Sequence, residues 1–555
     1  MRPLLRALAL FLALPLLAQG ALQPEVVERR LANGARVILA QRPGDGAFHA
    51  SLFFRQGGAD ETGAFVGATE LLARSLYGHT WPEDIDEDPA LDALLKQEEG
   101  LWEDLRLQRV QARRNPDSPP AQVEELQASL DALHQQIQAK LQQDPAADLY
   151  AAQGGRNQLS VATRDFLAFG VELPRAAFPF WCRTEVARLR RAELSRMPFD
   201  RGALLAEFKR AAYPKDPGIA VLLGAALPGH PYGRDLSDHA ASLEALRWSE
   251  LRAFVRRTCA PSRLAIVLVG DLDPAEVMAE LDQTLGRLPS QEGAEDAILP
   301  ELNPELGDRR VQVLGSDPRL LVGWRIPPRA HPDYSALALL AQILGGGASG
   351  RLEARLVDRQ GLLQDVDASL GRPGARFPGL FIVEAHPLEG HSVREAEAAV
   401  HSEILRLQQE PISLEEWQKA VSQLELAHLA TQEDAREFAL ALGLAWVQTG
   451  DWRTFLDEPR RWKALGPESL QRAARTYLVP LRRTTVAVER DVSASLDPID
   501  LQIIEVLKSL AASHLSDPAQ REALVSEGLR QMQMLPPAER ERTLKLLRAQ
   551  MELKR

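Results

Sequence analysis

The strongest constraint on how this chain can fold is a segment that occurs twice. Residues 244–271, EALRWSELRAFVRRTCAPSRLAIVLVGD, align without gaps on residues 463–490, KALGPESLQRAARTYLVPLRRTTVAVER. In both segments an amphipathic helical pattern is followed by a proline and then by an apolar run typical of a buried strand. Leu246 matches Leu465 and Pro261 matches Pro480 at the same offset. A supersecondary unit that recurs in this way indicates two related halves.

Strand and helix patterns alternate in both halves, which predicts an α+β fold class with two homologous halves. The first half is expected over residues 21–292 and the second over residues 309–492. Residues 293–308 are expected to link them, because the surrounding text, SQEGAEDAILPELNPELGD, is acidic and contains prolines. A length of 555 residues fits a chain of several domains.

Two segments depart from the repeated pattern. Residues 82–149 are rich in Glu, Gln, Leu and Ala and break at NPDSPP. Their apolar residues recur every three or four positions, which predicts an inserted hairpin of two antiparallel helices. The pattern fits either a hairpin that packs on its own body or one that binds a partner. Residues 493–555 predict a tail of two or three polar helices, for which the same two alternatives stand.

The first twenty residues predict a signal peptide over residues 1–20. Arg2 and Arg6 precede an apolar run that is short for a membrane span, and the small residues Ala18 and Gly20 follow it. The mature protein is therefore expected to be periplasmic or secreted, with no membrane span after signal cleavage. The alternative is an N-terminal anchor that is not cleaved.

The net charge bears on the class of partner, and the cysteine count bears on whether the chain has a disulfide. Sixty-five Lys and Arg stand against 77 Asp and Glu, and a net charge of −12 argues against a nucleic-acid partner. Cys182 and Cys259 are the two cysteines of the chain. An exported protein can join such a pair, but two cysteines do not make a disulfide framework, so a disulfide and two separate thiols both fit.

Residues 67–80, GATELLARSLYGHT, predict a helix on which Glu70 and Arg74 share a face, with Ala73 between them. This helix and four other passages resemble the pitrilysin/insulinase family of zinc metallopeptidases, in the branch of mitochondrial processing peptidase and its bacterial periplasmic homologues. The four passages are LANGARVILAQRP, PGHPYGRDL (228–236), APSRLAIVLVGDLDP (260–274) and LGGGASGRLEARLVDRQGLLQDVDAS (344–369). The resemblance covers Val26 to about Arg490.

Active members of that family carry an H-x-x-E-H motif on this helix, in which two histidines bind zinc and the glutamate activates water. The resemblance places these three positions on Glu70, Ala73 and Arg74, and a downstream glutamate ligand on Glu207. Arginine stays protonated and cannot bind zinc, and alanine cannot accept a proton. The resemblance therefore implies a degenerate member with no catalytic residue, with Glu207 as a residual ligand position. No cofactor is expected, although active relatives hold zinc.

Two hypotheses describe what Arg74 does instead. In the first, Arg74 takes the place of the metal and forms a buried pair with Glu207, and with Glu70 as well. In the second, Glu70 and Arg74 are an ordinary exposed pair one helical turn apart. A rearranged zinc site would draw on Glu70, His79 and Glu207. His230 is assigned no catalytic role.

The resemblance also implies substrate-binding residues in the second half. They are an arginine at Arg351, a glycine-rich turn at Gly345, Gly346 and Gly347, and Gln364, which stands where active members have a tyrosine. The strand that pairs with peptide in the family has asparagine and alanine where this chain has Leu159 and Ser160. Part of the substrate apparatus is therefore changed together with the metal site.

Relatives in this branch often work in pairs, with zinc on one subunit. The resemblance thus predicts a non-catalytic subunit, or a peptide-holding partner, of an active zinc-bearing paralogue, in contact with an unfolded peptide or protein substrate. One alternative is an autonomous zinc metalloendopeptidase with atypical ligands, which bound metal would reveal. The other is a stand-alone envelope scaffold or binding protein, which the co-purifying proteins would reveal.

Overall fold

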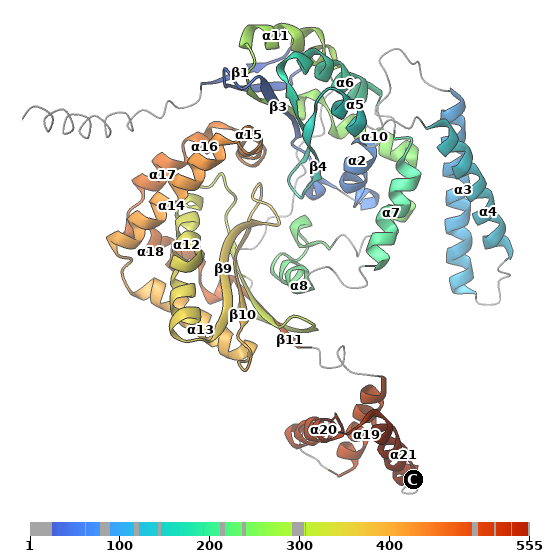
Figure 1. Cartoon of the computed structure of the whole chain (residues 1–555), viewed down its shortest axis with the longest axis vertical. Coiled ribbons are helices and arrows are strands. Elements are labelled where there is room, and N and C mark those ends of the chain that lie inside the picture. The colour runs from blue at the N-terminus through green and yellow to red at the C-terminus, as the bar shows by residue number, and fades with distance from the viewer. Residues whose placement is uncertain are drawn as a thin grey trace, which may run out of the picture.

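The structure is a computed structural model (Figure 1). It describes residues 25–61, 63–77, 89–115, 121–141, 146–191, 194–210, 217–235, 240–290, 305, 307–490, 498–514, 518–533 and 535–552. The signal peptide expected over residues 1–20, most of the expected linker 293–308 and His79 lie outside these residues.

The N-terminal half is built on a six-stranded sheet of order β1-β2-β6-β3-β5-β4. β2 and β6 run parallel and the other neighbours are antiparallel. The strands are β1 (Val26–Arg30), β2 (Arg36–Gln41), β3 (Ala47–Phe54), β4 (Arg156–Ala162), β5 (Leu167–Pro174) and β6 (Leu264–Gly270). Its helices are α2 (Ala68–Tyr77), α3 (Pro89–Arg114), α4 (Ala121–Lys140), α5 (Ala146–Ala152), α6 (Phe178–Arg191), α7 (Met197–Arg210), α8 (Pro217–Ala226), α9 (Ala240–Ala245), α10 (Trp248–Thr258) and α11 (Pro274–Gln283).

The C-terminal half is built on a five-stranded sheet of order β7-β11-β8-β10-β9. The strands are β7 (Arg309–Gly315), β8 (Arg319–Ile326), β9 (Leu363–Arg372), β10 (Gly379–Pro387) and β11 (Arg483–Arg490). Its helices are α12 (Tyr334–Gly345), α13 (Val393–Gln409), α14 (Leu414–Glu433), α15 (Ala435–Thr449), α16 (Arg453–Leu456), α17 (Glu458–Ala464) and α18 (Pro467–Tyr477).

The repeated sequence segment builds the same unit in both halves. Helix α10, a 3-10 turn at Pro261–Arg263 and strand β6 correspond to helix α18, a 3-10 turn at Pro480–Arg482 and strand β11. β6 is parallel to β2 and antiparallel to β3, and β11 is parallel to β7 and antiparallel to β8. The expected α+β fold with two related halves is confirmed.

Each half packs one of its helices on the sheet of the other half. Most helices of the N-terminal half cover one face of its own sheet, and α15 of the C-terminal half covers the other face, where Phe438 and Leu442 pack with Phe53 and Val267. In return, α8 of the N-terminal half packs on β8 and β11. The close approach explains Gly443, since a Cβ there would lie 2.2 Å from the Phe53 ring. The central strands of both sheets, such as β6 and β8, are thus covered on both faces, and the halves are docked.

A buried carboxylate ties the two halves together. Asp165, in the turn between β4 and β5, is 1% exposed. The backbone N–H groups of Ala375 and Arg376 donate to its Oδ2 over 2.8 and 3.2 Å, and Gln448 Nε2 donates over 3.2 Å. The Tyr232 hydroxyl donates to Oδ1. Because its partners come from both halves, Asp165 fixes how the halves meet.

The hairpin of α3 and α4 is anchored on its own body. Arg201 of α7 donates to Glu98 of α3 over 2.8 Å, and the two side chains are 1% and 0% exposed. The Arg201 guanidinium also lies 3.8 Å from the centre of the Trp102 ring and donates to the Leu246 carbonyl over 3.0 Å. His134 of α4 approaches Glu98 to 3.3 Å. Such a pair holds the hairpin in one orientation, because separating it would leave a buried charge.

The C-terminal tail contains three helices, α19 (Pro498–His514), α20 (Pro518–Gln533) and α21 (Pro537–Glu552), drawn apart from the two halves in Figure 1. They enclose an apolar cluster of their own, which includes Ile503, Leu507 and Leu529. The tail is therefore less uniformly polar than its sequence indicated. In the described part of the chain, no helix combines the length and the apolar character that crossing a membrane requires.

The question of a disulfide is answered by the positions of the two cysteines. Cys182 is buried in α6 and Cys259 follows α10, and both are free. Burial raises the pKa of the Cys259 thiol to about 12, and burial also raises the pKa of Cys182. Two separate thiols, protonated near neutral pH, are thus the alternative that the structure supports.

Candidate functional site

The site that the helix 67–80 predicts is formed where α2 packs against α7 and β4. The apolar face of α2, with Leu71, Leu72 and Leu76, is buried in the core of the N-terminal half. This packing turns Glu70 and Arg74 away from the core, where Glu207 of α7 meets them. The helix period, rather than any local motif, therefore sets which polar side chains come together.

The Arg74 guanidinium and the Glu207 carboxylate form a bidentate ion pair with two hydrogen bonds. Arg74 Nη1 donates to Glu207 Oε1 over 2.9 Å, and Nη2 donates to Oε2 over 2.9 Å. Nη2 also approaches Glu70 Oε1 at 3.4 Å. The hydrogen bonds that Arg74 donates to Glu207 are the main cause that raises the pKa of Arg74. Arg74 is thus held as a cation between the two carboxylates that the sequence placed near a metal position.

These residues do not fit a zinc ion. Both oxygens of Glu207 are occupied by Arg74, and the methyl group of Ala73 is buried in the core. Within the ranges that the structure describes, no three His, Cys, Asp or Glu side chains gather in a group that could hold a metal. A zinc site in this chain would therefore have to use residues outside those ranges, such as His79.

The exposure of the pair corrects one hypothesis. Arg74, Glu70 and Glu207 are 33%, 32% and 48% exposed, so the pair with Glu207 exists but is not buried. Exposed ion pairs contribute little because water screens them and ordering long side chains costs entropy. The pair with Glu207 is thus present, as the first hypothesis states, but its contribution to the free energy of unfolding should be small, as the second hypothesis implies.

We expect Arg74→Ala to lower the free energy of unfolding by no more than about 1 kcal/mol. Urea denaturation would measure this, with Arg156→Ala as a matched control, because Arg156 pairs with Glu172 on the exposed side of β4. The double variant with Glu207→Gln supplies a thermodynamic cycle. A loss well above about 2 kcal/mol that Glu207→Gln relieves would show that the carboxylate behaves as a buried charge after all.

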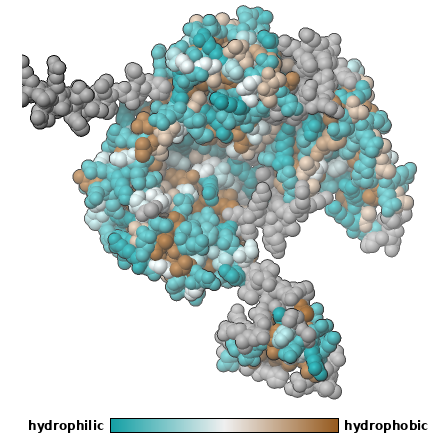
Figure 2. All heavy atoms as spheres, in the orientation of Figure 1, coloured by the Kyte–Doolittle hydropathy of each residue, from teal (hydrophilic) through white to brown (hydrophobic). Residues whose placement is uncertain are grey.

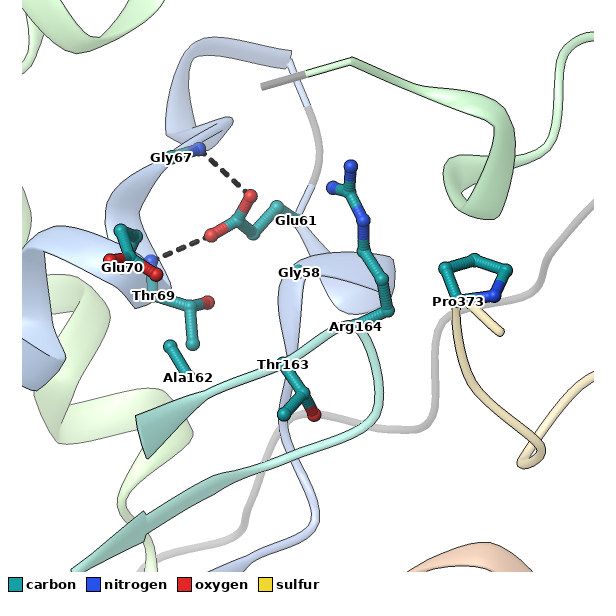
Figure 3. Close-up of a pocket in the computed structure, with 9 residues that line it drawn as sticks. All are labelled: Gly58, Glu61, Gly67, Thr69, Glu70, Ala162, Thr163, Arg164 and Pro373. Carbon is teal, nitrogen blue, oxygen red and sulfur yellow. Dashed lines mark hydrogen bonds between the residues drawn. The ribbon is translucent and has the colours of Figure 1, made fainter. Parts of the chain in front are cut away.

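A cavity of about 240 Å³ adjoins Glu70 (Figure 3). Its lining includes Glu61, Thr69, Thr163 and Arg164, and Pro373 of the C-terminal half borders it, so it lies where the halves meet. Glu61 is buried, and burial raises the pKa of its carboxyl group. Its oxygens accept the N–H groups of Gly67 and Thr69 over 2.8 and 2.6 Å, at the start of α2. Glu61 thus caps the helix that carries Arg74.

Strand β4 is the last strand of its sheet and lies beside α2. Leu159 and Ser160, which differ from the family pattern, lie in its middle. The Ser160 hydroxyl donates to the carbonyl of Ala73 over 2.6 Å. The serine at this position therefore links the edge strand to the helix at the residue where active relatives place their base.

The predicted substrate residues of the C-terminal half have different surroundings. Arg351 is 9% exposed and forms two bonds with Glu416 of α14, at 2.6 and 2.9 Å, which lower the pKa of Glu416 to about 2. Gln364 is exposed on β9. Gly345 is packed so closely that a Cβ would lie 2.2 Å from the Ala368 nitrogen, and Gly347 has a φ of +63° in open space. Gly346 lies between them, where an added Cβ would lie 2.3 Å from the Gln342 carbonyl oxygen.

His230 has a structural role. It is buried, its Nδ1 accepts the N–H of Tyr232 over 3.1 Å, and burial lowers its pKa to about 4.

The structure gives roles to three residues for which the sequence indicated none, namely Glu61, Asp165 and Ser160. Each bonds to partners that are distant in the sequence or that lie outside any known motif spacing.

Part of the chain matches a known protein family. Residues 248–424 match the family described as peptidase M16 inactive domain. An uncharacterized zinc protease of Mycobacterium leprae is 27% identical over 161 residues, which are 28% of this chain and 36% of that protein. The match to that curated relative therefore spans about a third of its length.

Solved structures agree on the fold. A protease from Helicobacter pylori superposes with a TM-score of 0.66 at 15% identity, covering 84% of this chain and 100% of that one. The first half of the periplasmic protease PqqL from Escherichia coli gives 0.62 at 14% identity, over 92% and 98% of the two chains. The expected resemblance to the insulinase-like peptidases is confirmed. The matched segment 248–424 excludes Ala73 and Arg74, so the case for a non-catalytic chain comes from those residues.

Proposed function

We propose that this chain has a non-catalytic role in proteolysis. It has the fold of M16-like peptidases, and its residues 248–424 match the peptidase M16 inactive domain. In this role the chain is a subunit, or a peptide-holding partner, of a zinc-bearing paralogue. It holds unfolded peptide or protein between its halves, in the periplasm or outside the cell.

One observation carries the proposal. Arg74 binds both oxygens of Glu207, and Ala73 stands at the position of the base, while the surrounding sheets, helices and docking of the halves are those of a peptidase. A guanidinium that already satisfies both oxygens of the residual ligand supports a chain without a zinc ion at this position, and zinc is what activates water in the active relatives.

Two further features support a peptide-holding role. The edge strand β4 carries backbone groups at the border of its sheet, and an extended peptide adds to such an edge by main-chain hydrogen bonds. The cavity of about 240 Å³ beside Glu70 lies next to the end of β4, where it offers room for a side chain.

The test combines metal content with a partner assay. We expect the purified mature chain to contain zinc far below one ion per chain by elemental mass spectrometry. Each zinc-bearing M16 homologue from the same genome would then be mixed with it, and chelator-sensitive cleavage of an unfolded fluorogenic peptide followed. Cleavage by the pair should exceed cleavage by the paralogue alone, and should vanish when the paralogue's own zinc ligand is replaced.

Two results would overturn the proposal. Zinc near one per chain that is lost in Glu207→Gln would show an autonomous metallopeptidase with atypical ligands. Failure to bind or stimulate any zinc-bearing homologue, together with stable capture of unrelated envelope proteins, would show a stand-alone scaffold.

A further inference from the structure

A second cavity, of about 220 Å³, lies at another border between the halves and is lined by four arginines. Arg30 ends β1, Arg36 begins β2, Arg55 follows β3 and Arg263 precedes β6, so all four lie at the same end of four neighbouring strands of the N-terminal sheet. The C-terminal half contributes Trp446 and Gly450 from the end of α15. The described residues that line this cavity include no aspartate or glutamate.

The positive charge of this cavity is only partly compensated by the surrounding protein. Arg30 makes no ion pair with any residue that the structure describes. Arg36 pairs with Glu28, but Glu28 also receives Arg453 Nη2 over 2.5 Å. Arg263 lies 3.9 Å from Asp60, whose other oxygen is 2.7 Å from Arg376. Each of these two carboxylates thus serves two guanidinium groups.

Gathering like charges in a partly enclosed space is unfavourable unless an anion joins them. Guanidinium groups bind phosphate oxygens through paired N–H donors, and several of them around one cavity suit an anion with many oxygens better than a single carboxylate. We infer that this cavity binds a small soluble anion that carries one or two phosphate groups. The site is independent of Arg74 and Glu207 and of the proposed partner.

The position of the site gives binding a structural effect. Arg55 Nε already donates to the Val447 carbonyl of α15 over 3.1 Å, so the cavity wall crosses from one half to the other. An anion held by Arg30 and Arg36 beside Trp446 adds contacts across the same border. Because it binds the docked chain and not the unfolded one, it raises thermal stability.

Isothermal titration calorimetry of the full mature chain with sodium pyrophosphate tests the inference. We expect one binding event per chain and, in a separate thermal denaturation, an increase in melting temperature. Arg30→Gln should weaken binding at least about tenfold, because a charge-assisted hydrogen bond is lost, and Arg30→Gln with Arg36→Gln should abolish it.

The neighbouring Arg29→Gln is the matched control. Arg29 is exposed on the same strand but pairs with Asp282 and does not line the cavity, so its replacement should leave pyrophosphate binding unchanged. Equal weakening by Arg29→Gln and Arg30→Gln, or no saturable binding at all, would overturn the inference. Acetate that binds as tightly as pyrophosphate would overturn the choice of a phosphate anion.

The same phosphate chemistry occurs on lipids, and a separate arm distinguishes that source. Vesicles of phosphatidylcholine with phosphatidic acid would be sedimented with the chain and with the Arg30→Gln variant. Arg30-dependent sedimentation without any binding of soluble pyrophosphate would show a lipid headgroup and overturn the soluble anion.

Discussion

Replacing Glu70 and Arg74 together with histidine is expected to make the chain bind about one zinc ion, whereas we expect the natural chain to bind far less than one. The two positions are one helical turn apart on α2 and face Glu207, to which Arg74 is bonded over 2.9 Å. Two histidines and one glutamate form a known zinc ligand set. The substitution also removes the guanidinium that occupies both Glu207 oxygens.

Elemental mass spectrometry after dialysis measures the zinc content of the double variant. Adding Glu207→Gln is the control, because it keeps the helix surface and removes the third ligand, and zinc should fall sharply. The melting temperature of the double variant should rise with added zinc, as it does for any ligand of the folded state. A double variant that stays free of zinc would show that α2 and α7 are not spaced as a metal site requires.

Replacing Asp165 with alanine is expected to lower stability by about 3–5 kcal/mol. The buried carboxylate accepts the N–H groups of Ala375 and Arg376 and the Tyr232 hydroxyl, and all of these donors would lose their partner at once. Because the donors belong to both halves, the loss should also loosen their docking. Differential scanning calorimetry would show the fall in melting temperature, and small-angle scattering a larger radius of gyration.

Asp367→Ala is the control for Asp165→Ala, since Asp367 is exposed on β9 and its loss should change neither quantity. Asp165→Asn keeps the shape and one acceptor oxygen, so it should fall between the two. A melting temperature of Asp165→Ala equal to that of Asp367→Ala would contradict the role of Asp165 as the tie between the halves.

The sequence predicts those features that are periodic or repeated. The duplicated segment indicates two related halves because helix, proline and strand recur at one offset, and the helix period places Glu70 and Arg74 on one face. The pairing with Glu207 follows from the family resemblance. Its exposure does not, because burial depends on how α7 sits against α2.

Other features depend on contacts between residues far apart in the chain. Asp165 bonds to backbone groups more than two hundred residues away, and nothing in its local sequence distinguishes it from a turn aspartate. Glu61 accepts N–H groups at the start of α2, although it lies further before the helix in sequence than residues that usually cap a helix. The four arginines of the second cavity converge only because four neighbouring strands of the sheet have their ends side by side.

Helix α7 forms two ion pairs that connect it to two other helices. Arg201 in its first half is locked to Glu98 of the hairpin, and Glu207 is paired with Arg74 of α2. The two residues are six positions apart in the helix, about 9 Å along its axis. A protein that binds the outer end of α3 and α4 and shifts the hairpin would therefore also move α7. That movement would displace the Glu207 carboxylate, and with it the ion pair with Arg74.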